Sequence, residues 1–128
     1  NIKVMTRLRF ISEKKHIPLE LRTEEKRQAF DAILIRSLHR DRKPLKLLPI
    51  IGKKPLDTYE LFLQMDCRGG YQNVMQDKLF KEVGEALDLS HSVTNAVWRL
   101  KVKFEQLIQP YIEIIRKNIW PDSPGALI

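Results

Sequence analysis

The sequence predicts an all-α domain. Apolar residues recur at helical spacing in nearly every segment, prolines and a pair of glycines fall between those segments, and no stretch gives a convincing strand or hairpin pattern. Hydrophobic residues make up 43% of the 128 residues, which is enough to fill one core in a chain of this length. We therefore expect a single bundle of about six helices.

The first helix is expected to run from Thr23 to about Arg40. Thr23 is a suitable N-cap, and Glu24 and Glu25 place negative charge in the first turn, where the helix dipole favours it. The apolar residues that share one face are Ala29, Phe30, Ile33, Leu34 and Leu38. Residues 1–25 are interpreted as an N-terminal extension packed on the core, residues 26–115 as the domain itself, and residues 116–128 as a C-terminal tail.

Residues 40–55 are predicted to form a long loop rich in arginine, lysine and proline. A loop of this length inside a compact domain is usually functional or disordered. No acidic stretch that could neutralise it is evident. Its cationic residues are Arg40, Arg42, Lys43, Lys46, Lys53 and Lys54.

The remaining helices are placed by their first and last residues. Pro55 suits the first turn of the next helix, which should stop at the left-handed turn of Gly69 and Gly70. Asp77 is the expected N-cap of a further helix. A longer helix is expected from Ser92, kinked or ended by Pro110, with a last helical stretch over residues 111–119. Its predicted inward residues are Val93, Ala96, Val97, Leu100 and Phe104.

Composition limits the function. The formal net charge of +7 suggests a polyanionic partner, nucleic acid first and an acidic membrane surface second, unless the lysines are simply scattered. Cys67 stands alone, so no internal disulfide is possible, and with only three scattered histidines no zinc site or other cofactor is expected. No acid–base pair or nucleotide-binding loop is found, so we do not expect an enzyme. No apolar run could span a bilayer and no signal peptide is visible, and the start at Asn1 suggests a piece of a longer protein.

Several short motifs follow one another in a fixed order. They are Leu56-Asp57-Thr58-Tyr59-Glu60-Leu61, Gly69-Gly70-Tyr71 with Val74, Lys78-Leu79-Phe80, Ala96 with Leu100 and Phe104, and Leu107-Ile108-Gln109-Pro110-Tyr111, preceded by Pro44 and Leu48-Pro49-Ile50. In this order and spacing the chain resembles the ARID (AT-rich interaction domain) family over roughly residues 26–115. Phe80 stands where the family usually has Trp, Arg42 where it commonly has Gly, and Asn95 where some sequence-reading members have Ser.

The resemblance implies a duplex DNA-binding module of a chromatin or transcription regulator in the nucleus, with little sequence preference or a weak preference for AT. It places the helix from Ser92 to about Glu105 in the major groove as part of a helix-turn-helix, with the loops on either side. Residues at the start of such a helix contact base edges, and these are Ser92, Thr94 and Asn95. Ser92 could instead only cap the helix, and Asn95 could be solvated.

Further along the same helix, Arg99, Lys101 and Lys103 suit phosphate oxygens, unless they form only a solvated face. Trp98 and Trp120 could stack on bases, but packing in a core or interface is the favoured interpretation. A second hypothesis is a protein-interaction module of a chromatin complex in which DNA binding is weak or lost, with the apolar termini docking other domains or subunits. The domain itself is expected to be monomeric.

Overall fold

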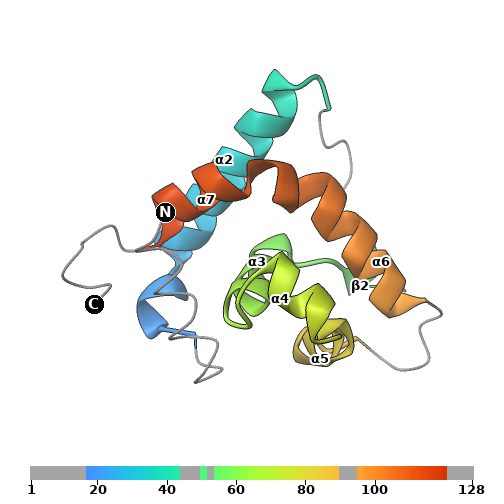
Figure 1. Cartoon of the computed structure of the whole chain (residues 1–128). Helices are drawn as coiled ribbons and strands as arrows, with labels where there is room; N and C mark the ends of the chain where they lie inside the picture. The colour runs from blue at the N-terminus through green and yellow to red at the C-terminus, as the bar shows by residue number, and fades with distance from the viewer. Residues whose placement is uncertain (1–16, 44–49, 52–53, 90–94, 121–128) are drawn as a thin grey trace.

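A computed structural model describes residues 17–43, 50–51, 54–89 and 95–120. The predicted all-α class is confirmed, and helices account for nearly all of the regular structure (Figure 1). In chain order the elements are η1 (Leu19–Leu21), α2 (Glu24–Arg40), β1 (Ile50–Ile51), β2 (Lys54–Pro55), α3 (Thr58–Asp66), α4 (Tyr71–Gln76), α5 (Phe80–Ala86), α6 (Ala96–Lys103), η2 (Phe104–Ile108), η3 (Gln109–Tyr111) and α7 (Ile112–Ile119).

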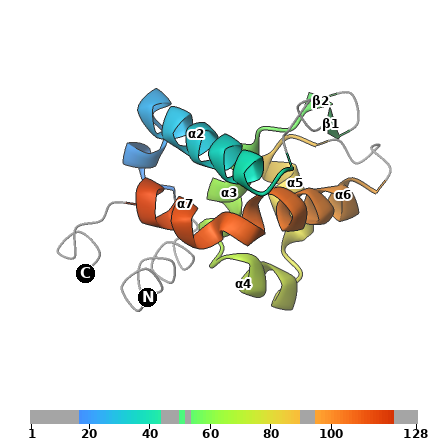
Figure 2. The same cartoon turned by 90° about the horizontal axis from the view of Figure 1, so that it is seen from above.

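Helix α2 begins and ends where the sequence predicts. The Thr23 hydroxyl accepts a hydrogen bond from the Lys26 amide at 3.2 Å, which satisfies one of the free N–H groups of the first turn. Its predicted apolar face is buried, because Phe30, Ile33 and Leu34 all point into the core. Helix α2 lies along α7, and Figures 1 and 2 show the two helices side by side.

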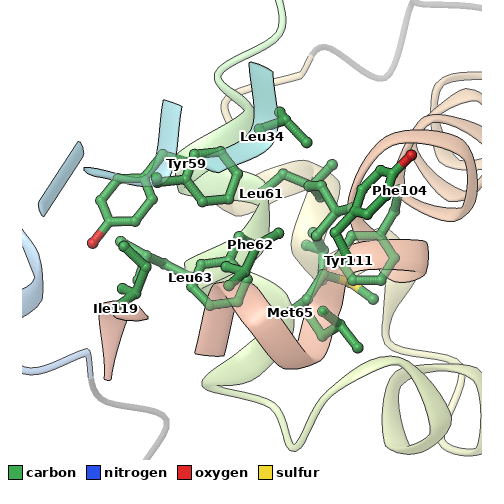
Figure 3. Close-up of a cluster of buried hydrophobic side chains, with 14 of the residues drawn as sticks. Leu34, Tyr59, Leu61, Phe62, Leu63, Met65, Phe104, Tyr111 and Ile119 are labelled. Atoms are coloured by element: carbon green, nitrogen blue, oxygen red, sulfur yellow. The ribbon is translucent and has the colours of Figure 1, made fainter. Parts of the chain in front are cut away.

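Helix α3 lies at the centre of the domain. Its residues 61–66 are all buried, as expected for a helix that is covered on every side. Tyr59 and Phe62 meet Phe30 of α2 with ring centroids 5.1 and 5.6 Å apart. Side chains from α2, α3, η2 and α7 converge on this centre (Figure 3). Helix α3 contacts α2, α4, α5 and η2, so its position determines how these elements pack around the core.

Two of the expected helix starts, at Pro55 and after Asp77, are wrong. Pro55 belongs to β2, which pairs with β1 in a short antiparallel ladder that the sequence did not indicate. Helix α3 begins three residues later because the Asp57 carboxylate caps it, accepting from the Glu60 amide at 3.0 Å. Asp77 is a C-cap rather than an N-cap: it ends the short helix α4, in a segment where no helix was expected, and α5 begins after Leu79.

The helical stretch from α6 to α7 is continuous but bent at Pro110, as Figure 1 shows. Proline lacks an N–H, and its ring collides with the carbonyl four residues earlier. Before and around Pro110 the helix therefore changes its winding, to a wider π-helical turn in η2 and a tighter 3-10 turn in η3. The predicted kink is therefore confirmed.

A buried ion pair fastens α7 to the end of α3. Asp66 is fully buried, and Arg116 donates two hydrogen bonds to its carboxylate, at 2.9 and 3.1 Å. Burial lowers the pKa of Arg116, but Asp66 outweighs this and raises it. Trp120 donates from Nε1 to the same carboxylate at 2.9 Å, so its predicted packing role is confirmed. A Cβ on Gly70 would lie 2.8 Å from Arg116 Nη2, and the residue has a φ of +89°, so glycine is required there.

The segment before α2 touches the core in its described part. Leu21 is buried, and its carbonyl accepts a hydrogen bond from the Tyr59 hydroxyl. The predicted domain boundaries at 25 and 115 stay predictions.

Cys67 is a buried thiol, and burial raises its pKa. In the described part of the chain, no helix is long and apolar enough to cross a membrane, and no group of side chains could hold a metal ion.

Candidate nucleic-acid interface

Helix α6 packs on α5, the helix before it, through one row of side chains. Leu100 and Phe104 are fully buried and lie one turn apart, so they define the inward row of the helix. On α5, Gly84 faces this row, because a Cβ there would lie 3.4 Å from Leu100 Cδ1. This contact leaves the opposite side of α6 open to solvent, as expected for a helix that presents residues to a partner.

Helix α6 begins later than expected. Asn95 is its N-cap and has a left-handed backbone, with a φ of +57°, so the right-handed helix cannot extend through it. The predicted start at Ser92 is therefore wrong. Ser92, Val93 and Thr94 lie outside the described residues. The Asn95 side chain caps nothing and is exposed at the first turn of the helix.

The outward side of α6 starts with three exposed residues, Asn95, Trp98 and Arg99. They stand at i, i+3 and i+4, which places them next to one another on the helix surface. Trp98 is 63% exposed, so it does not pack in the core of this domain, and its packing in an interface with a partner stays a prediction. It lies two residues before the buried Leu100, roughly 200° around the helix, and this spacing could have placed it outside.

Two other assignments on α6 need comment. Val97 was expected to point inward but is 42% exposed, because it lies about 60° away from the row that contains Leu100. Lys101 and Lys103 are half-buried and flank the exposed side. Within the described part of the chain, neither these lysines nor Arg99 makes an ion pair.

The first part of the basic loop follows the end of α2. Arg40, Arg42 and Lys43 are all exposed. Arg42 has a φ of +59°, a left-handed conformation that at helix ends is usually adopted by glycine. The Arg42 and Lys43 amides donate to the carbonyls of His39 and Leu38 at 3.0 and 2.8 Å, so the last turn of α2 is closed by backbone bonds.

Asp41 is the only carboxylate among residues 40–43. One of its oxygens accepts from the Tyr111 hydroxyl at 2.7 Å, and the other lies 3.4 Å from Arg40 Nε. The Tyr111 hydrogen bond holds the pKa of this carboxyl below its ordinary value, with Arg40 adding to the effect. The negative charge of Asp41 is therefore partly balanced inside the basic segment.

The second part of the loop reaches α6. Strand β1 lies beside α6, and Figure 2 shows the β1–β2 ladder close to this helix. Ile51 is buried, while Ile50 is 59% exposed. The backbone of Lys54 pairs with Ile51, whereas Lys46 and Lys53 lie outside the described residues. The structure thus brings the far end of the loop to α6 and leaves Arg40, Arg42 and Lys43 at the end of α2.

Other arginines are neutralised elsewhere. Arg22 and Arg27 pair with Glu60 and Asp57 at 2.6 and 2.7 Å, on the side of the domain where α2 meets α3. Burial opposes the charged form of both carboxylates, but the arginines outweigh it, and the pKa of each carboxyl is lowered. Cations without an ion pair to a described residue remain at the end of α2 and along α6, and also elsewhere, at Lys78, Lys81 and Lys117.

Comparison with known proteins decides the family. The family model described as the ARID/BRIGHT DNA-binding domain matches residues 26–112. The chain belongs to the ARID family. It is 33% identical over 108 residues to protein dead ringer of Drosophila melanogaster, and 31% identical over 108 residues to AT-rich interactive domain-containing protein 3A of Danio rerio. These matches cover 84% of this chain but only 12% and 18% of those two proteins.

The ARID resemblance drawn from the motifs is confirmed, and the motifs have structural roles. Gly69 and Gly70 form the left-handed turn between α3 and α4, with φ values of +95° and +89°. Phe80, at the position of the usual tryptophan, is buried and packs edge-on against Tyr71. Arg42, at the position of the common glycine, has a left-handed backbone that glycine would adopt without strain, and it adds an exposed cation.

Proposed function

We propose that this ARID domain binds duplex DNA, with α6 in the major groove and the basic end of α2 on the phosphates. The observation that carries the proposal is the exposed side of α6, where an amide, an indole and a guanidinium lie together at its first turns. Half or more of the hydrogen bonds to DNA go to the backbone, so cations around such a side give affinity, and the side itself gives any base preference.

The chemistry of Asn95 and Trp98 suits a weak preference for AT. An asparagine amide can bond to the N6 and N7 atoms of adenine, and an apolar ring can contact the thymine methyl group. Ser92 and Thr94 come one to three positions before Asn95 in the chain and remain candidates for base contact. Arg99, Lys101 and Lys103, together with Arg40, Arg42, Lys43, Lys46, Lys53 and Lys54, are the candidates for phosphate contact.

The test is fluorescence anisotropy of the chain with AT-rich and GC-rich duplexes over a series of salt concentrations. We expect salt-sensitive binding to both duplexes, because each neutralised phosphate adds about 0.9 to the slope of log affinity against log salt. Charge reversal at Arg42 and Lys43 should weaken binding and reduce the slope by the amount expected for the loss of about two phosphate contacts. Charge reversal at the exposed Lys117, on the last turn of α7, is the matched control and should change little.

The base preference has its own test. If Asn95→Ala removes a preference for the AT-rich duplex while the salt slope stays the same, Asn95 reads bases. If the preference is absent from the start, the domain is a sequence-independent anchor. Absence of any binding at low salt would sink the DNA proposal.

A second candidate function is protein docking within a chromatin complex. Exposed apolar residues on η1, α2 and α7 favour it: Leu19, Ile35 and Ile114. The relatives are much longer than this chain, so other domains could supply such contacts. Under either function we propose that the protein acts in the nucleus as part of a chromatin or transcription regulator, with the domain itself monomeric. Light scattering that detects dimers at micromolar concentration would contradict the last point.

A further inference from the structure

One hydrogen bond connects the two basic parts of the proposed interface. Tyr111 stands at the bend between α6 and α7, and its hydroxyl donates to Asp41 at the end of α2, 70 positions away in sequence. The tyrosine is 5% exposed, so its ring is anchored in the core while its hydroxyl reaches the surface. Figure 2 shows the end of α2 beside this bend.

The bond fixes the place of the neighbouring cations. Helix ends commonly fray, and among the described residues those after α2 have, besides backbone bonds to its last turn, only the contacts of Asp41 with Tyr111 and Arg40. Asp41 is directly followed by Arg42, whose left-handed backbone turns the chain away from the helix. A tie at Asp41 therefore sets where Arg40, Arg42 and Lys43 lie relative to the helical rod that begins with α6.

The bond also governs charge. Asp41 is a carboxylate in a segment that is proposed to meet phosphates, and its second oxygen already contacts Arg40 at 3.4 Å. While Tyr111 donates to Asp41, one of the hydrogen bonds that the carboxylate accepts comes from a neutral hydroxyl group. Without that donor, the carboxylate would draw Arg40 and Lys43 to itself, and both would be less available to DNA.

We propose that Tyr111 and Asp41 are positioning residues for DNA binding, which hold the basic end of α2 in register with α6 and keep Arg40 and Lys43 available for phosphate. This inference rests on the proposed DNA-binding function. Neither residue needs to touch DNA, so both act through the cations beside them.

Three variants test it in the same anisotropy experiment. Tyr111→Phe should lower the salt slope by about 0.9 and weaken binding about eightfold at 0.1 M salt, the loss of one phosphate contact. Asp41→Asn removes the competing charge and should tighten binding a few-fold. In the Asp41→Asn background, adding Tyr111→Phe should cost less than eightfold, because no carboxylate is left to capture the cations and only the loss of register remains.

A control separates positioning from stability. Tyr59→Phe also removes a buried tyrosine hydrogen bond, to the Leu21 carbonyl, but far from the basic segment. It should lower the melting temperature and leave the salt slope unchanged. If Tyr111→Phe behaves like Tyr59→Phe, with lower stability but an unchanged slope, the positioning role is overturned while DNA binding stands. If Asp41→Asn weakens binding, the role is likewise overturned. If the unaltered chain fails to bind DNA, both proposals fall.

Discussion

Replacing Arg42 with glycine should raise stability and weaken DNA binding at the same time. Arg42 has a φ of +59°, a conformation that costs a side-chain-bearing residue about 1 to 2 kcal/mol and costs glycine almost nothing. Part of this gain is offset because glycine has more freedom in the unfolded chain, by about 0.5 to 1 kcal/mol. A net gain of about 1 kcal/mol corresponds to a rise of roughly 4 °C in melting temperature for a domain of this size.

The effect on binding has the opposite sign. If Arg42 contacts one phosphate, its loss lowers the salt slope by about 0.9 and the affinity about eightfold at 0.1 M salt. Thermal denaturation followed by circular dichroism measures the first effect, and anisotropy with a labelled duplex measures the second. Residues that bind DNA at a cost in backbone strain are expected to show this opposition.

Lys78 offers a matched control. It has a φ of +56°, is exposed, and closes the end of α4 with the same pattern of backbone bonds that closes α2. Lys78→Gly should therefore give a similar rise in melting temperature with little change in affinity. The reasoning is refuted if Arg42→Gly lowers stability, or if both glycine variants weaken DNA binding equally.

Three further predictions follow from the described contacts. Trp98→Ala should weaken DNA binding several-fold while changing stability by less than about 0.5 kcal/mol, because the side chain is largely exposed; a large fall in melting temperature would argue against this placement. Arg116→Leu should destabilise the fold by about 3 kcal/mol in urea denaturation, since it leaves the Asp66 carboxylate buried without its cation. The pKa of Glu60 is lowered from its ordinary value of 4.5, so the stability that its charged form contributes is present above that pH and is lost as pH falls through the lowered pKa. Arg22→Met should reduce this loss of stability at acid pH, and an unchanged pH dependence of the free energy of unfolding would contradict the ion pair.

Helix α2 was predictable because all of its signals agree. A capping threonine, acidic residues in the first turn and an apolar face at helical period point to the same segment, and the buried pattern of Phe30 and Leu34 follows directly. The start of α3 was not, because Pro55 suits a helix start and a short edge strand equally well. The pairing of Lys54 with Ile51 decides between them, and local sequence does not show that pairing.

The DNA contacts of the candidate site stay predictions, but the structure places some of its residues differently from what the sequence suggested. Its cations could be identified from charge and spacing. The left-handed Asn95 could not be foreseen, because Ser92 is an equally good cap by composition. The core alternative for Trp98 failed because a large aromatic residue usually packs inside a domain, whereas the row set by Leu100 places it outside. The link between Tyr111 and Asp41 depends wholly on tertiary structure.

The buried Asp66 also limits how the last helix can settle. Ile112, Ile115 and Ile119 form an apolar stripe on α7, and a helix with such a stripe could shift by one turn and still make hydrophobic contacts. A slipped helix would carry Arg116 about 5 Å away from Asp66 and strand a charge in the interior. The Arg116–Asp66 ion pair thus selects a single register of α7 against the core, which the apolar contacts alone would leave open.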